Sequence, residues 1–169
     1  MDLQSTDFEI MGVPTQFAQD LAALDAAWKN LQRQVHPDKF VGQGAAAQRV
    51  AMQWSVRVNE AYQRLKNPLQ RASYLCSLQG VGIEAESNTA MPTDFLMQQM
   101  EWREALDEAE GAGQLQALAD EVLQAQQAAY AELEQLLDVQ HDYAAAAVGV
   151  RKLMFIQKFA QEIRQRQLG

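Results

Sequence analysis

Two amphipathic helical patterns flank one polar tripeptide, and they constrain the fold more than any other feature of the sequence. On both sides of His36-Pro37-Asp38, apolar residues recur three or four positions apart, which is the spacing of one helix face. The upstream residues are Leu24, Trp28, Leu31 and Val35, and the downstream ones are Val50 or Ala51, Trp54, Val58, Ala61 and Leu65. The pattern therefore predicts a hairpin of two helices with the tripeptide as its loop.

The tripeptide itself has two interpretations. Pro37 disfavours helical backbone at His36, and Gly42 and Gly44 suit a connector. In the simpler interpretation, Pro37 ends a helix and Asp38 begins a turn. In the other, the hairpin holds a histidine and an aspartate at its tip, where they meet another molecule.

The composition predicts an all-α protein. Among its 169 residues, Ala, Leu, Gln and Glu are abundant, whereas Gly and Pro are sparse. Cys76 is the only cysteine, so no internal disulfide forms and a reducing compartment is expected. No stretch approaches the roughly 20 apolar residues of a membrane span, and the start lacks the features of a secretory signal. We therefore expect a cytoplasmic protein without a membrane partner.

The charge is unevenly distributed along the chain. Residues 1–78 carry eight basic and seven acidic side chains, and residues 79–169 carry six and fifteen, which together give the net charge of −8. Halves that differ this much are expected to meet different partners. A nucleic-acid partner is not expected, because phosphate binding needs concentrated Lys and Arg.

Periodicity and capping residues divide the chain into two helical regions. The first region holds a short helix or turn at 7–13, with Phe8 and Met11 directed inward, followed by helices at 21–35, 44–66 and 68–78. Asp20 is expected to be the N-cap of the helix at 21–35. Residues 79–92 are expected to be a linker. The second region predicts helices at 93–110, 114–138 and 142–167, with Thr93 as an N-cap and Gly111-Ala112-Gly113 as a break. Short connections favour an antiparallel three-helix bundle.

The helix predicted at 93–110 has two apolar faces. A helical projection places Phe95, Trp102, Leu106 and Ala109 on the side expected to face the core. The opposite side holds Leu96, Met97, Met100, Glu101, Glu104 and Glu108. Because one helix of so small a bundle cannot bury both faces, the second is expected to bind a partner protein, or else to dock on the other domain or form a dimer contact.

Basic side chains surround the tripeptide. Lys29 and Arg33 lie four residues apart and project together, and Lys39, Arg49 and Arg57 are also expected to be exposed. Such a face is either an ordinary solvated surface or a partner site. Catalysis is not expected, since His36 and Asp38 lack a nucleophile and a pocket, and the remote His141 completes no metal set with them. His141 is expected at a helix junction, and Cys76 in the core of the helix at 68–78.

The sequence resembles a known family in five elements that occur in the same order. They are Asp7-Phe8-Glu9-Ile10-Met11-Gly12-Val13, His36-Pro37-Asp38, Val58-Asn59-Glu60-Ala61-Tyr62, Leu65 with Asn67-Pro68, and Arg71 with Tyr74. This series resembles the J domain of DnaJ-type co-chaperones over residues 1–78. Together with residues 93–169, the variant His36-Pro37-Asp38-Lys39-Phe40 resembles the HscB co-chaperones of iron-sulfur cluster assembly.

The resemblance implies two partners. His36, Pro37, Asp38, Lys29, Arg33 and Lys39 would meet a DnaK-class chaperone of the HscA type and stimulate its ATPase, with Arg49 and Arg57 less clearly involved. An IscU-type scaffold protein would bind Leu96, Met97, Met100, Glu101, Glu104 and Glu108, together with Phe155. Some family members carry an N-terminal pair of Cys-x-x-Cys motifs; their absence from this chain predicts no bound zinc, and no cofactor is expected.

Three alternatives remain. A general J protein for unfolded clients would carry a Gly/Phe-rich segment and zinc-binding repeats, which this sequence lacks. A helical nucleic-acid-binding module disagrees with the acidic second region, and an enzyme would need a reactive constellation. The chain departs from the family where Val35 replaces a common aromatic residue, and where Gln98 and Gln99 are uncharged.

Overall fold

The computed structural model describes residues 1–83 and 91–169, and these residues form helices and no strands. Their contacts divide the chain into two compact units, Met1–Leu75 and Cys76–Gly169, called here the N-terminal unit and the C-terminal unit. The all-helical prediction is confirmed. The linker expected at 79–92 lies for the most part outside the described residues, which stop at 83 and resume at 91.

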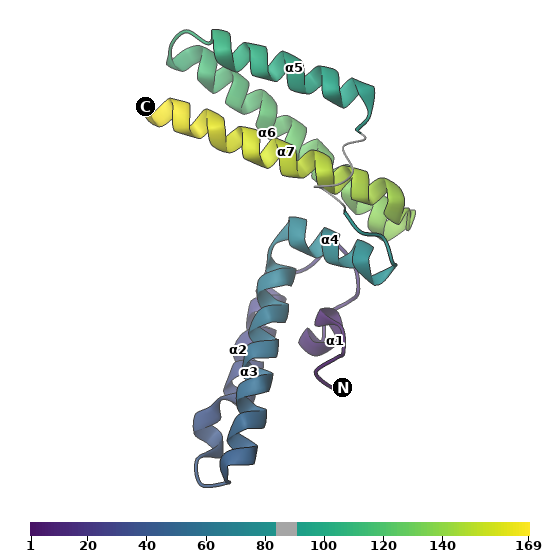
Figure 1. The fold of residues 1–169 in the computed structure, drawn as a ribbon, viewed down its shortest axis with the longest axis vertical. Coiled ribbons are helices and arrows are strands. Elements are labelled where there is room, and N and C mark those ends of the chain that lie inside the picture. Colours follow the sequence, from purple (N-terminus) through teal and green to yellow (C-terminus); the bar gives the residue numbers. More distant parts are fainter. Residues whose placement is uncertain (84–90) are drawn as a thin grey trace. The chain divides into compact units, whose positions relative to one another are not determined.

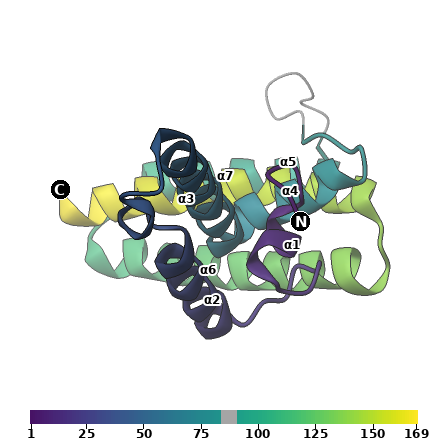
Figure 2. The same cartoon turned by 90° about the horizontal axis from the view of Figure 1, so that it is seen from below.

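The N-terminal unit is built on an antiparallel hairpin. Its helices are α1 (Asp7–Met11), α2 (Leu21–Val35), the 3-10 turn η1 (Pro37–Phe40), α3 (Ala45–Lys66) and most of α4 (Pro68–Leu78). Figures 1 and 2 show α2 and α3 side by side, with the short α1 beside them. The predicted cap of α2 is confirmed, because the Asp20 carboxylate accepts from the Ala23 N–H at 3.1 Å.

The hairpin buries less of α2 than its pattern predicted. Leu24 is fully buried, but Trp28, Leu31 and Val35 are only partly buried. Two helices without a third layer cannot cover a whole apolar stripe, so Trp28 instead stacks on the Tyr62 ring at 4.6 Å. Along α3, Ala51 and not Val50 faces the core.

A buried carboxylate links α1 to α3 in this unit. The Asp7 side chain is fully buried, and its oxygens lie 2.8 Å from Arg57 Nη1 and 3.1 Å from Arg64 Nε. Arg57 also donates to the carbonyls of Leu3 and Ser5, at 3.0 and 2.8 Å. The prediction that Arg57 is exposed is therefore wrong, because a buried carboxylate needs a nearby countercharge.

The C-terminal unit contains three long helices. They are α5 (Thr93–Glu108), α6 (Ala112–Glu134) and α7 (Tyr143–Leu168), and the π-helix η2 (Gln135–Val139) continues α6. Successive helices run in opposite directions, as the short turns between them require (Figure 1). Cys76 belongs to this unit: it is buried, its thiol contacts the Tyr143 carbonyl oxygen at 3.7 Å, and burial raises its pKa to about 11.

Three local predictions in this unit were inaccurate. Thr93 is the first helical residue of α5, with Pro92 at the cap position, so it is not the N-cap. Gly113 lies inside α6, and Gly111 alone provides the break, with a φ of +89°. The α-helical part of α6 ends at Glu134, four residues earlier than predicted, and η2 fills the remainder.

Residues 1–83 and 91–169 contain no helix with the length and hydropathy of a membrane span.

The buried network around Asp7 gives the first prediction. Asp7→Asn leaves Arg57 and Arg64 facing a neutral, buried amide. The free energy of unfolding of the N-terminal unit should fall by about 2–3 kcal/mol. This loss is smaller than the usual cost of breaking a fully buried pair, because both arginines are partly exposed. Urea denaturation measures the change. Glu60→Gln is the matched control, since it removes only the surface pair with Arg64 and should cost about 0.3 kcal/mol. Equal losses in both variants would contradict the role of Asp7.

Candidate functional site

The tip of the hairpin holds the first candidate surface. His36 follows the last residue of α2 with ψ of 130°, and η1 begins at Pro37. The tripeptide is therefore a cap residue followed by a 3-10 turn, not an irregular loop. The His36 Nδ1 accepts a hydrogen bond from the Asp38 backbone N–H at 3.2 Å. Because an accepting nitrogen carries no proton, the neutral ring has its proton on Nε2 and can donate it to an external acceptor.

The two polar side chains of the tip remain open to solvent. The His36 side chain is 56% exposed and the Asp38 side chain 87%, and His36 Nδ1 lies 3.5 Å from Asp38 Oδ2. Because the neutral ring carries no charge and both side chains are exposed to water, this contact contributes little to folding. The tip therefore presents one imidazole and one carboxylate in a backbone geometry fixed by Pro37.

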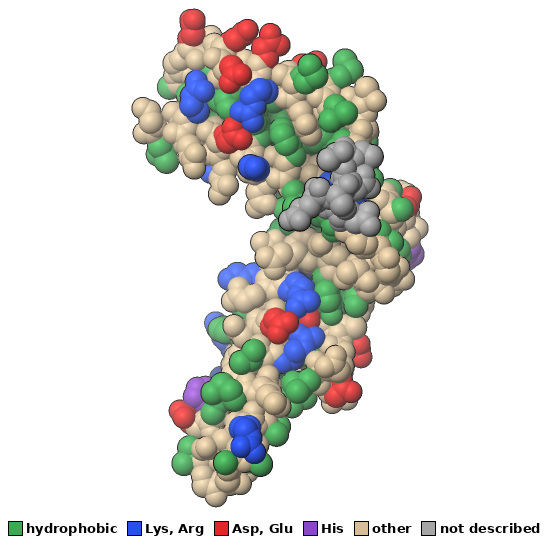
Figure 3. Space-filling view, viewed as in Figure 1, with side chains coloured by type: hydrophobic (Ala, Val, Ile, Leu, Met, Phe, Trp, Pro, Cys, Tyr) green, Lys and Arg blue, Asp and Glu red, His purple; other side chains and the backbone are tan. Residues whose placement is uncertain are grey.

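Four of the basic side chains predicted to surround the tripeptide lie exposed in the N-terminal unit. They are Lys29, Arg33, Lys39 and Arg49, and none has an ion-pair partner within residues 1–83 and 91–169. Lys29 and Arg33 are one turn apart on α2, and Lys39 is in η1, immediately after Asp38. Figure 3 shows histidine, acidic and basic side chains near one another at the hairpin end of this unit. Arg57 does not belong to this exposed group.

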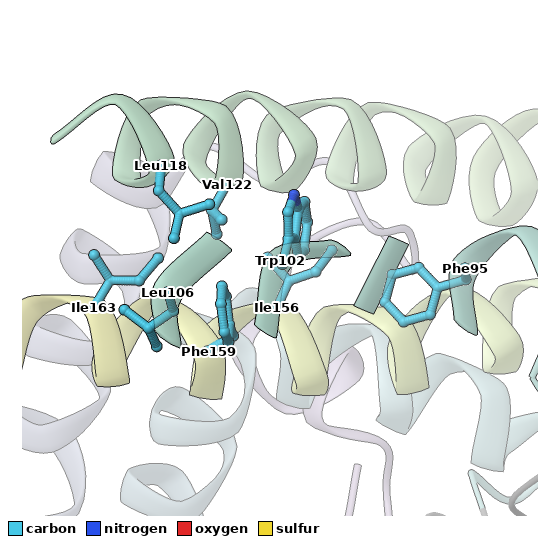
Figure 4. Close-up of a cluster of buried hydrophobic side chains, with 8 residues drawn as sticks. All are labelled: Phe95, Trp102, Leu106, Leu118, Val122, Ile156, Phe159 and Ile163. Atoms are coloured by element: carbon cyan, nitrogen blue, oxygen red, sulfur yellow. The ribbon is translucent and has the colours of Figure 1, made fainter. Parts of the chain in front are cut away.

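The inner face of α5 forms the bundle core with α6 and α7. Figure 4 shows Phe95, Trp102 and Leu106 of α5 directed toward residues of the other two helices, and all three are buried. Trp102 stacks on Phe159 with 5.8 Å between ring centroids. The predicted inner face is confirmed except at Ala109, which caps α5 and is only partly buried.

The outer face of α5 is exposed, as its pattern predicted. Leu96, Met97 and Met100 are 42%, 58% and 71% exposed, and Glu101, Glu104 and Glu108 are exposed as well. In Figure 3, hydrophobic side chains lie toward the N-terminal end of α5 and acidic ones gather toward its C-terminal end. Flexible apolar side chains beside carboxylates are typical of protein-binding surfaces.

An open hollow of about 600 Å³ lies between α5 and α7. It is lined by Gln99, Met100, Arg103, Glu104, Asp107, Glu108 and Phe155. Phe155 is partly buried and its ring meets the Phe95 ring edge-on, with 5.8 Å between centroids. The structure thus brings Met100, Glu104 and Glu108 together with Phe155, whereas Leu96, Met97 and Glu101 lie outside the hollow on the same helix.

Sequence reasoning missed one cation in this hollow. The Arg103 guanidinium makes two hydrogen bonds to the Glu162 carboxylate of α7, at 2.7 and 3.1 Å, and lies over the Phe159 ring. The hydrogen bonds from Arg103 lower the pKa of Glu162 and raise the pKa of Arg103. No local signal identifies this pair, because its members are 59 positions apart. The described parts of the chain also contain no group of three His, Cys, Asp or Glu side chains placed to hold a metal ion.

Comparison with known sequences gives a family match to the second half of the chain and relatives along nearly all of it. The model described as the HSCB C-terminal oligomerisation domain matches residues 91–164. A co-chaperone protein HscB homolog of Bordetella avium is 50% identical over 157 residues, which are 92% of this chain and 94% of the relative. The HscB homolog of Burkholderia thailandensis is 50% identical over 166 residues, covering 96% and 94%.

Solved structures with the same fold include two HscB proteins. The chaperone HscB from Vibrio cholerae has a TM-score of 0.81 and 36% identity, with 96% of this chain and 98% of that chain covered. The human co-chaperone protein HscB has a TM-score of 0.89 and 28% identity, covering 99% of this chain and 84% of that chain.

The pair in the hollow gives the second prediction. Because hydrogen bonds from Arg103 hold the pKa of Glu162 below the usual glutamate value, Glu162 should stay ionised to lower pH than an unpaired glutamate. NMR titration of the side-chain carboxyl carbons measures this. Arg103→Gln should move the Glu162 midpoint upward toward its ordinary value, whereas Lys29→Gln in the other unit should leave it unchanged. An unchanged midpoint in Arg103→Gln would contradict the interaction.

Proposed function

Because the chain belongs to the HscB family of co-chaperones, we propose that it couples an IscU-type iron-sulfur scaffold protein to the ATPase of an HscA-type, DnaK-class chaperone. The chain has the family's two parts, a J domain and a helical bundle. We assign residues 1–78 to the J domain, 79–92 to a linker and 93–169 to the scaffold-binding bundle. The scaffold is delivered to the chaperone in the cytoplasm. The chaperone, and not this chain, hydrolyses ATP.

The J domain acts through the hairpin tip. Lys29, Arg33 and Lys39 carry uncompensated positive charge beside the tripeptide, which favours docking on an acidic surface of the chaperone's nucleotide-binding domain. His36 can donate from Nε2, and Asp38 can accept, in a turn fixed by Pro37. Bound there, the tip would favour the hydrolysis-competent arrangement of the chaperone, which is a shift of conformational populations and not a chemical step.

The bundle binds the scaffold through the outer face of α5. The observation that carries this proposal is the exposure of Leu96, Met97 and Met100 on a helix whose opposite side already supplies the bundle core. Phe155 extends the apolar surface from α7, and Glu101, Glu104 and Glu108 orient the partner by charge. Holding both proteins raises the effective concentration of the scaffold at the chaperone.

The third prediction tests the hairpin tip through ATP turnover of the HscA-type chaperone, measured with and without the scaffold. The protein and the scaffold together should stimulate turnover more than the sum of their separate effects. His36→Gln should abolish the stimulation and leave scaffold binding intact, because only the tip is changed. His141→Asn, at the other histidine, is the matched control and should retain full stimulation, since His141 lies at the junction before α7.

The other outcomes of this measurement are equally informative. Stimulation that is indifferent to scaffold would favour a general J protein for unfolded clients. If no DnaK-class chaperone responds, the role given to the tripeptide is wrong.

The fourth prediction tests the α5 face. Leu96→Ala combined with Met100→Ala should weaken scaffold binding by about 1–4 kcal/mol, as expected for anchor residues of an interface. The melting temperature should hardly change, because both side chains are exposed. Leu123→Ala removes an equally exposed leucine from α6 and should leave binding unchanged. A large fall in melting temperature of the double variant would show instead that these residues stabilise the fold.

A further inference from the structure

Arg103 is surrounded by carboxylates of its own helix. Glu104 and Asp107 line the hollow with it, and Asp107 stands one helical turn further along α5. The charge of Asp107 contributes to the raised pKa of Arg103, after the larger effect of Glu162, so Asp107 acts on Arg103 through space without an ion pair between them. Opposite charges at this spacing commonly pair on a helix surface. Left to its own helix, Arg103 would neutralise part of the acidic face.

The structure shows a different arrangement. Both Nη atoms of Arg103 bond to the two oxygens of Glu162 on α7, and the guanidinium lies 5.1 Å from the Phe159 ring centroid. This two-point geometry is the strongest form of an arginine-carboxylate pair. Lys158 is the other cation that acts on Glu162. Glu101, Glu104, Asp107 and Glu108 have no ion-pair partner within the described ranges, and of these Asp107 has the spacing at which Arg103 would pair along α5.

We propose that Glu162 is a positioning residue, which holds Arg103 away from the α5 carboxylates and so keeps the hollow available for a basic side chain of the scaffold. This inference rests on the proposed function of the α5 face. The hollow suits a lysine or arginine, because Met100 and Phe155 offer apolar contact to an aliphatic stem and the carboxylates meet its charged end.

Three variants test the proposal: Glu162→Gln, Arg103→Gln and the double variant. Calorimetric titration with the IscU-type scaffold at low ionic strength gives the affinities. Glu162→Gln should weaken binding about two- to fivefold, the size of an exposed ion pair, because the released Arg103 then neutralises carboxylates that the scaffold needs. Arg103→Gln should bind as well as the parent protein or better. The double variant should match Arg103→Gln, since no released cation remains.

The asymmetry between the two single variants separates this role from a structural one. If the pair only clamps α5 to α7, both single variants should bind equally weakly, both should lose melting temperature, and the double variant should not recover. That result would overturn the proposal. Because charge effects are screened by salt, the defect of Glu162→Gln should also diminish as ionic strength rises, and a salt-independent defect would count against it.

Two controls complete the experiment. Glu121→Gln removes one negative charge from an exposed position of α6 outside the hollow, and it should bind like the parent protein. A loss equal to that of Glu162→Gln would mean that net charge alone matters, which overturns the proposal. The parent protein and the Leu96→Ala, Met100→Ala variant are measured first. Parent binding that the α5 substitution does not weaken would contradict the proposed function itself, whereas a weakened α5 variant with equal single variants at 103 and 162 would contradict only this inference.

Discussion

The buried charge of Asp7 is the constraint on which the N-terminal unit depends. A carboxylate without solvent must be neutralised locally, and Arg57 and Arg64, two turns apart on α3, supply the countercharge. Arg57 also donates hydrogen bonds to the backbone carbonyls of Leu3 and Ser5, which ties the start of the chain to α3. These contacts therefore fix the second half of α3, the end of the hairpin opposite to the His36-Pro37-Asp38 tip. The His36 and Asp38 side chains at the tip are exposed and take no part in the ion pairs of Asp7.

A second constraint shapes the C-terminal unit: a helix in a three-helix bundle contributes one face to the core. Phe95, Trp102 and Leu106 use that face of α5. The apolar residues on the opposite face are therefore not needed for the core, and their exposure supports the proposal that this face binds a partner. The core also positions the surface above it, since Phe155 reaches the hollow while its ring rests edge-on against Phe95.

The sequence predicted the helices well because their signals are local. The Asp20 carboxylate caps its helix within one turn, and the helix expected at 68–78 begins at a proline, so the structure reproduces both closely. The ion pairs of two arginines were not predicted. Arg57 was expected to be exposed and Arg103 was not noticed, because their partners Asp7 and Glu162 are distant in sequence and adjacent only in the folded chain. Residues 84–90 lie outside the described structure.

These two arginines show why formal charge and available charge differ. Counting residues makes Arg57 part of the basic surface and Arg103 a neutralising cation on the acidic one. In the folded chain each is already paired with a carboxylate of its own unit. The basic surface near the tip is thus smaller than the sequence implies, and the acidic face of α5 retains more uncompensated charge than its composition suggests. Because attraction between proteins depends on uncompensated charge, the intramolecular pairs help to determine which partner each unit can attract.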